Sequence, residues 1–163
     1  EAKAVTTFKE GYPTTPVWSS DSRFLLFKTD KREVYRYDVS SKSLKRILAS
    51  NDGNIYDIKL SPDNNWLAYT MPGENDMTRI YILNLSTGKS LPVTVKWFDA
   101  GSPRWSEDGK YLFFLSDRTY NINYSSVEWN TSFSKSNHLT YAVGKSEICV
   151  FFLWLCCFES TEA

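Results

Sequence analysis

The pattern of apolar and polar positions repeats three times along the chain. Each copy has a large apolar residue, the sequence Ser-x-Asp-x, and then a run of mostly apolar residues. The copies occupy residues 16–27, 58–69 and 103–114. The large apolar residues that precede the shared Ser lie 42 and 45 residues apart. A period in the low to mid forties is the length of one four-stranded blade of a β-propeller.

Each copy predicts a strand, a tight turn and a second strand. The large apolar residue, which is Trp18, Leu60 or Trp105, is expected to end the first strand and to point into the core. The Asp of the turn can accept hydrogen bonds from backbone N–H groups two residues on. Asn64 and Gly109 follow this Asp and tolerate positive φ, and Ser22 fills the same position in the first copy. An apolar run bounded by turns suits a strand that is covered on both faces.

A second block also repeats. Residues 34–43 match residues 80–90, and both alternate apolar and polar positions before a turn rich in Ser, Thr, Gly and Lys. This pattern predicts a third strand and its hairpin. Residues 44–49 and 91–97 would then form the outer strands. The sequence therefore predicts an all-β fold, a partial β-propeller of about three four-stranded antiparallel blades, because a sandwich would not repeat at a fixed interval.

The pattern breaks after Leu115. Residues 116–130 form a polar stretch studded with aromatic residues, which we interpret as an insertion between strands. Long insertions in compact repeats are often functional loops. Residues 139–143 could supply the next strand of the third blade.

The last part of the chain does not follow the repeat. Residues 148–158 are eleven unbroken apolar residues, too few to span a bilayer and too apolar for an exposed outer strand. A shifted reading frame or a misplaced end would produce such a tail. We therefore divide the chain into propeller blades at 1–133, with repeats near 16–50, 58–97 and 103–133, and an atypical, truncated or frame-shifted tail at 134–163.

Composition narrows the choice of partners. Lys plus Arg and Asp plus Glu number 19 each, so the formal net charge is zero. A neutral chain offers no electrostatic attraction for nucleic acid or anionic membranes, and we expect neither as a partner. The three Cys residues all follow residue 148, so no disulfide framework is expected and the compartment stays open, with the cytoplasm favoured over the periplasm. The start at Glu1 favours an internal fragment over a processed chain.

The chain offers little catalytic chemistry. His138 is the only histidine, and a nucleophile–base pair would have to combine it with Ser134 or Ser136. No Gly-x-Ser-x-Gly elbow is present. The adjacent Cys156 and Cys157 cannot easily face one metal ion. We predict no catalytic residue, no metal and no cofactor.

One group of residues is a candidate binding site. Asp117, Arg118, Glu128 and Trp129 lie in or beside the insertion, where charge and an aromatic ring could contact a peptide or a neighbouring domain. The alternative is structural: Asp117 and Arg118 would form a local ion pair, and Trp129 would pack at the blade edge.

The repeats resemble those of known propellers. The Ser-x-Asp-x copies are similar to the WD40-like repeats of TolB-type propellers, prolyl-oligopeptidase propellers and tricorn proteases. Residues 102–118, which end in Ser-Asp-Arg, together with Glu-Trp-Asn at residues 128–130, resemble the tricorn protease family. This resemblance covers roughly residues 10–133.

The resemblance implies a large serine peptidase with β-propellers, a PDZ-like module and a separate C-terminal catalytic domain. Its propellers would control the passage of peptides without cleaving them. We therefore expect a non-catalytic segment that serves peptide access or domain assembly, within a homo-oligomeric parent protein whose other blades and downstream domains are its partners. The alternatives are a TolB-like propeller that binds a protein partner without enzymatic activity and, less favoured, a free-standing hydrolase.

Overall fold

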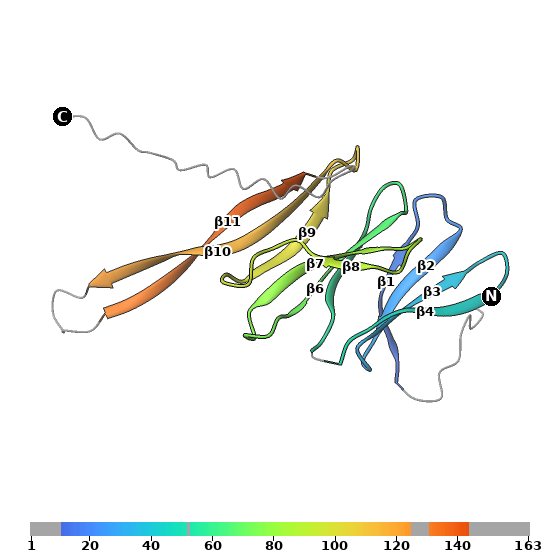
Figure 1. The fold of residues 1–163 in the computed structure, drawn as a ribbon, viewed down its shortest axis with the longest axis horizontal. Coiled ribbons are helices and arrows are strands. Elements are labelled where there is room, and N and C mark those ends of the chain that lie inside the picture. The colour runs from blue at the N-terminus through green and yellow to red at the C-terminus, as the bar shows by residue number, and fades with distance from the viewer. Residues whose placement is uncertain (1–10, 52, 125–130, 144–163) are drawn as a thin grey trace, which may run out of the picture.

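The computed structural model describes the backbone of residues 11–51, 53–124 and 131–143, and the side chains as far as residue 117. Within these ranges the chain forms eleven strands in three antiparallel sheets that lie side by side (Figure 1). No helix of this part of the chain is long and apolar enough to cross a membrane. The predicted all-β propeller architecture is confirmed.

Each sheet is one blade, and its strands follow one another in chain order. The first blade consists of β1 (Pro13–Trp18), β2 (Phe24–Thr29), β3 (Glu33–Asp38) and β4 (Ser43–Ala49). The second consists of β5 (Tyr56–Leu60), β6 (Trp66–Pro72), β7 (Thr78–Asn84) and β8 (Ser90–Pro92). The third consists of β9 (Ala100–Trp105), β10 (Tyr111–Tyr124) and β11 (Thr131–Val143).

The turn between the first two strands of each blade is held by the same bonds three times. The Ser hydroxyl accepts the backbone N–H five residues on, at 2.9–3.0 Å. The Asp carboxylate accepts the N–H two residues on, at 3.0–3.2 Å. The residue directly after this Asp has positive φ in every blade: 56° at Ser22, 60° at Asn64 and 68° at Gly109. Both predicted features of this turn are confirmed.

The hairpin between the third and fourth strands also repeats. The Asp38 carboxylate accepts the N–H groups of Ser40 and Ser41 at 3.1 and 3.0 Å. The pKa of Asp38 is lowered to about 2. The main cause is the bond from the Ser41 N–H, followed by the bonds from the hydroxyls of both serines. In the second blade Asn84 accepts the N–H groups two and three residues on, at 3.0 and 2.9 Å. A short polar acceptor therefore closes both turns.

Two apolar layers hold the blades together. One lies between the first and second blades and is formed by Phe24, Leu26, Val34, Ile55, Ile58, Leu67, Tyr69 and Leu83. The other lies between the second and third blades and is formed by Ala68, Ile80, Ile82, Val93, Ala100, Leu112 and Phe114. β6 supplies residues to both layers, which confirms that its apolar run is covered on both faces. β10 buries only alternate residues near its start, since Tyr111 and Leu115 are exposed.

One core prediction is wrong. Trp18 ends its strand as expected, but its side chain is 59% exposed. Leu60 and Trp105, at the same position of the repeat, pack against the apolar layer shared with the blade before them. Trp18 belongs to the first blade, and the described residues place no blade before it. Burial at this position therefore depends on the neighbouring blade.

The predicted outer strand of the second blade is shorter than expected. Residues 91–97 were expected to form it, but β8 ends at Pro92. Proline has no N–H to donate to the ladder, so it marks a sheet edge. Beyond it the backbone is held by Thr94, whose carbonyl accepts from the Arg79 guanidinium at 2.7 Å and whose hydroxyl accepts from the Ile80 N–H at 3.1 Å.

The predicted insertion is mostly strand. Residues 116–124 continue β10, and β11 starts well before the expected 139–143, so the two strands form one long hairpin that extends away from the blades (Figure 1). Cross-strand backbone hydrogen bonds do not require apolar side chains, which is why a polar sequence can extend the ribbon. The division at residue 133 stays a prediction, and β11 runs across it.

Replacing Ser22 by glycine should stabilise the fold. Ser22 has a φ of 56°, a region that costs an L-residue energy and costs glycine little. We expect Ser22→Gly to raise the free energy of unfolding by about 0.5–1 kcal/mol, measured by urea denaturation.

The reciprocal change is the control. Gly109 has the same role with φ of 68°, so Gly109→Ser should lower stability by a similar amount. A lower denaturation midpoint for Ser22→Gly at an unchanged slope would show that this position is not strained.

Candidate functional site

The first strands of the three blades form a continuous inner edge. β1, β5 and β9 each end their sheet, and β5 lies beside both β1 and β9. We call this the inner edge. An edge strand presents unpaired backbone N–H and C=O groups on its free side. This surface can therefore meet an extended chain.

Each strand of the inner edge carries a bulge at the same position. Thr15, Asp57 and Ser102 have positive φ of 52°, 40° and 54°. The pairing of each strand with its neighbour shifts register around these residues. Positive φ is uncommon outside glycine, and bulges bend a strand and re-aim its side chains. The result is a row of three short polar side chains, all exposed along the inner edge.

The bulges of the second and third blades are in contact. The Ser102 N–H donates to the Asp57 carboxylate at 3.4 Å, across the junction of the second and third blades. Sequence reasoning missed this row, because no glycine marks it. Its only signal is a short polar residue three positions before Trp18, Leu60 and Trp105.

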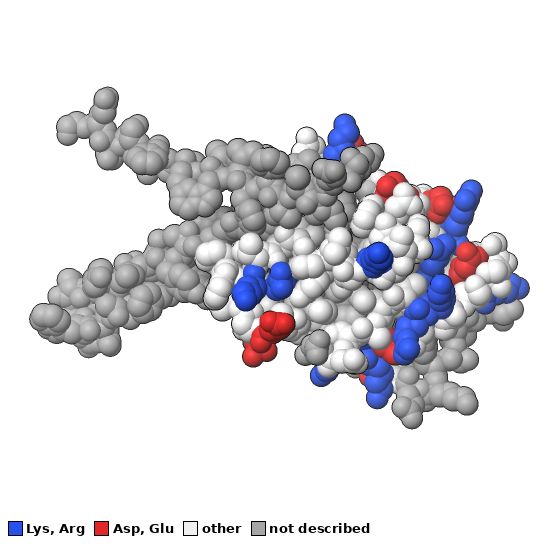
Figure 2. All heavy atoms as spheres, viewed as in Figure 1, with Lys and Arg blue, Asp and Glu red and all other residues white. Residues whose placement is uncertain are grey.

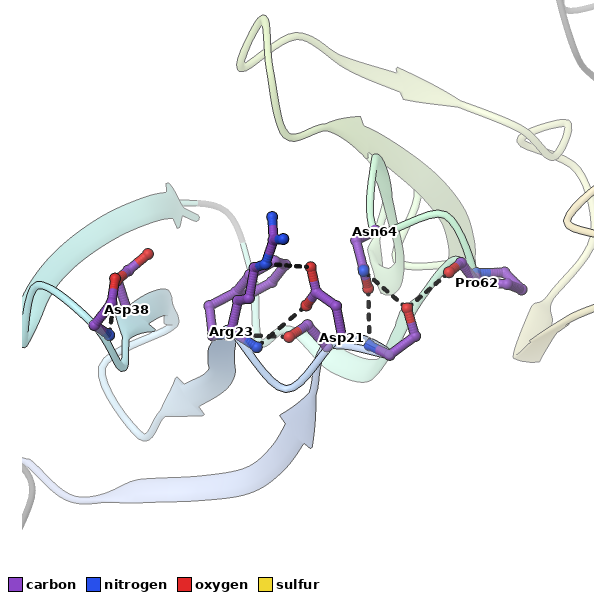
Figure 3. A network of polar contacts seen from close by, with 9 residues as sticks. Asp21, Arg23, Asp38, Pro62 and Asn64 are labelled. Atoms are coloured by element: carbon purple, nitrogen blue, oxygen red, sulfur yellow. Dashed lines mark hydrogen bonds and ion pairs between the residues drawn. The ribbon is translucent and has the colours of Figure 1, made fainter.

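The turns at the ends of the inner strands also join neighbouring blades (Figure 3). The Ser20 N–H donates to the Asn64 side-chain oxygen at 3.0 Å, and the Asn64 amide donates to the Ser20 hydroxyl at 2.8 Å. The same hydroxyl donates to the Pro62 carbonyl at 2.9 Å. At the next junction, a Cβ added to Gly109 would lie 3.7 Å from Pro62. The hydrogen bonds of Ser20 to Asn64 and Pro62 fix the first blade against the second.

The turns carry charge of both signs. Asp21 lies 3.5 Å from Arg23, and Asp108 lies 3.4 Å from Lys110. A hydrogen bond from the Ser hydroxyl two residues before lowers the pKa of both Asp residues, so they are anionic at neutral pH. Basic and acidic side chains are intermixed over the face in Figure 2.

Two of the four predicted binding residues lie in the described backbone. Asp117 and Arg118 are consecutive in β10, where the pairing with β11 shifts register between Asp117 and Thr119. Arg118 is therefore the bulged residue, and the Asp117 N–H donates to the Asp99 carbonyl at 3.0 Å. The side chain of Arg118 lies outside the described side chains, so the expected ion pair is untested. Glu128 and Trp129 lie outside the described residues.

Ser134 and Ser136 were considered above as partners of His138, but the strand pairing places a different serine opposite it. In the β10–β11 register His138 lies opposite Ser116. The Ser116 hydroxyl is buried and donates to the Asp99 carbonyl at 3.1 Å, which is a structural role. Among the described residues, no group of three His, Cys, Asp or Glu could hold a metal ion.

Removing the Asn64 side chain should loosen the first blade junction. Asn64→Ala deletes two hydrogen bonds to Ser20 and leaves a Cβ at positive φ. We expect a loss of about 1–2 kcal/mol in the free energy of unfolding. A double-mutant cycle with Ser20→Ala should give a coupling energy of about 0.5–1.5 kcal/mol. Strictly additive effects would mean that the two turns do not support each other.

The sequence was compared with protein families and with known proteins. The sequence model described as the tricorn protease second beta propeller domain matches residues 1–147. The chain is 31% identical over 120 residues to tricorn protease homolog 1 of Streptomyces coelicolor, which covers 72% of this chain and 10% of that protein. It is 29% identical over 130 residues to the Tol-Pal system protein TolB of Francisella tularensis, covering 77% of this chain and 29% of that one.

A solved structure agrees with the sequence comparison. The crystal structure of the tricorn protease superposes with a TM-score of 0.72 at 23% identity, over 83% of this chain and 14% of that one. The chain thus spans only a small part of the tricorn relatives that it matches. The match of the family model over residues 1–147 shows that the chain belongs to the tricorn protease family, as a β-propeller region of the second propeller type.

Proposed function

We propose that this chain is a non-catalytic propeller segment of a tricorn-like serine peptidase, where it serves peptide access or domain assembly. Family membership supports a role within a larger protein, and the inner edge supports contact with an extended chain. The flanking blades and downstream domains of a homo-oligomeric parent protein would be its partners.

The observation that carries this proposal is the bulged inner edge. Three adjacent edge strands present exposed polar side chains, and a bulge interrupts each of them. Bulges prevent an added strand from pairing along the full edge. A peptide at this edge would meet short stretches of backbone and small side chains such as Thr15, Asp57 and Ser102. Such contacts suit transient passage better than tight capture.

A second contact surface is proposed on the long hairpin. β10 and β11 extend beyond the other strands in Figure 1, and Asp117 and Arg118 lie at the bulge within them. Glu128 and Trp129 follow in the same segment of the chain. We propose that these four residues contact a peptide or a neighbouring domain, because charged and aromatic side chains close together in the sequence are typical of contact sites.

The second candidate function is a TolB-like propeller that binds a protein partner without enzymatic activity. The identity to the TolB proteins, over a larger share of the relative than for tricorn proteases, favours it. The coding sequence after residue 163 separates the two. A peptidase region downstream supports the tricorn-like role, and a stop codon directly after the propeller supports the TolB-like one.

The purified chain should not cleave peptides. Acyl transfer by a serine enzyme requires a nucleophile, a base within hydrogen-bond reach and an oxyanion hole. The only histidine, His138, lies opposite a buried Ser116 whose hydroxyl bonds to a carbonyl. Fluorogenic peptides incubated with the chain should therefore give no signal above buffer.

The His138→Ala variant is the control for this experiment. Cleavage that persists through purification and disappears in His138→Ala would overturn the proposal in favour of a free-standing hydrolase. Cleavage of equal rate in both preparations identifies a contaminating peptidase, and repurification until it disappears leaves the expected negative result.

Reversing the charge at the hairpin bulge should weaken contacts with acidic chains. We expect Arg118→Glu to weaken binding of a fluorescein-labelled acidic peptide by about threefold to fivefold, the size of an exposed charge effect. Fluorescence anisotropy measures the change. Lys110→Glu, an exposed charge in the turn before β10, is the matched control and should have little effect. Equal effects of the two variants would show that binding follows net charge and not the hairpin.

A further inference from the structure

The first blade departs from the repeat at Arg36. Arg36 in β3 takes the position that Ile82 has in β7, because Asp38 and Asn84 close the equivalent hairpins two residues later. Ile82 is only 8% exposed and belongs to the apolar layer between the second and third blades. The first blade therefore has a charged side chain where the second blade buries an apolar one.

The Arg36 side chain is positioned by a buried aromatic ring. Its guanidinium lies over the ring of Phe24, with Cζ 3.9 Å from the ring centroid. Phe24 is 4% exposed and belongs to the apolar layer between the first and second blades. Arg36 pairs with Leu26, so it lies on the same face of the sheet as that layer, and it is half-buried there.

The hydrogen-bond donors of this guanidinium are unused. In the part of the chain that the structure describes, no carboxylate or carbonyl oxygen accepts from Arg36. Asp38, two residues on, instead accepts from Ser40 and Ser41. Arginine has five N–H donors in a planar fork, which matches the two oxygens of a carboxylate. Because a half-buried charge without a partner is costly, the site fits an incoming carboxylate.

The surface around Arg36 is basic. Residues 24–49 contain seven Lys and Arg against three Asp and Glu, whereas residues 66–92, the same part of the second blade, contain two of each kind. Lys45 pairs with Arg36 across β3 and β4, so it lies on the same face, and it is exposed. Lys42, in the hairpin between these strands, is also exposed. Figure 2 shows basic side chains over β3 and β4. Charge complementarity therefore favours an acidic partner.

Protection of the sheet edge does not explain Arg36. β4 is the outer strand of the first blade, and a lysine on an outer strand hinders pairing with other chains. This effect accounts for Lys45 without any partner. Arg36 is in β3, which has a neighbouring strand on each side. Its charge and its unused donors therefore have another reason.

We propose that Arg36 binds a carboxylate in an extended acidic segment of a partner protein, with Lys42 and Lys45 as flanking contacts. The guanidinium, held over Phe24, donates to both oxygens of one Asp or Glu carboxylate. An acidic protein segment fits better than nucleic acid, because zero net charge gives the chain no long-range attraction to a polyanion. The site is separate from the inner edge and from the long hairpin, so the inference does not rest on the proposed function.

Fluorescence anisotropy with the full chain and a fluorescein-labelled oligoglutamate peptide tests the proposal. We expect the wild-type chain to bind the peptide, and the affinity to fall as salt is added. Arg36→Gln should weaken binding by about tenfold, because it removes both the charge and the two-pronged contact. Arg36→Lys keeps the charge and loses the planar fork, so it should weaken binding by about threefold. Urea denaturation checks the fold of both variants, and Arg36→Lys carries the test if Arg36→Gln is unfolded.

Arg46→Gln is the matched control. Arg46 lies in the next strand but pairs with Tyr35, so it is on the opposite face of the sheet, and its guanidinium is 2.6 Å from the Glu33 carboxylate. The substitution changes the net charge by the same amount as Arg36→Gln. We expect it to leave the affinity for the peptide within about twofold of the wild-type value.

Five results would overturn the proposal. A wild-type chain that does not bind the peptide is the first, and binding that Arg36→Gln leaves unchanged is the second. Equal weakening by Arg36→Gln and Arg46→Gln would show that binding follows net charge. Tighter binding of a DNA duplex than of the peptide, weakened by Arg36→Gln, would make nucleic acid the occupant. Self-association in sedimentation velocity that Arg36→Gln abolishes and the peptide does not compete away would make the occupant a second copy of the chain.

Discussion

The fold depends on one small polar unit, the Ser-x-Asp-x turn. Its serine hydroxyl and its carboxylate accept backbone N–H groups that would otherwise lack partners, and this happens with the same geometry in all three blades. Because these bonds hold the backbone in one geometry, the turn fixes where the inner strand ends and where the apolar strand begins. Successive side chains of a strand point to opposite faces of the sheet, so the first residue of the apolar strand determines which face each later side chain is on.

The blades are then joined by packing and by contacts between turns. Apolar side chains at equivalent positions fill both junctions, while Ser20 and Asn64 link the turns of the first two blades. Each blade therefore covers apolar side chains of the blade beside it. A repeat architecture of this kind gains stability from nearest-neighbour interfaces, so a face without a neighbour stays exposed.

The same arrangement limits what the described part of the chain can do chemically. Its repeated hydroxyls and carboxylates are engaged in turns, and Ser116 is bonded to a backbone carbonyl. The described surface also includes the bulged inner edge and the long hairpin. The chain belongs to the tricorn protease family, and it spans only a small part of the length of the relatives that it matches.

The sequence alone determined the repeat, the blade length, the turns and the positive φ at Ser22, because these features depend on residues close together in the chain. Tertiary structure decided the rest. Trp18 and Trp105 are identical residues in matching contexts, yet Trp105 packs against the apolar layer shared with the second blade while Trp18 is exposed. The bulges at Thr15, Asp57 and Ser102 left almost no sequence signal, since a bulge depends on how a strand pairs with its neighbour and not on the residues next to it in the chain.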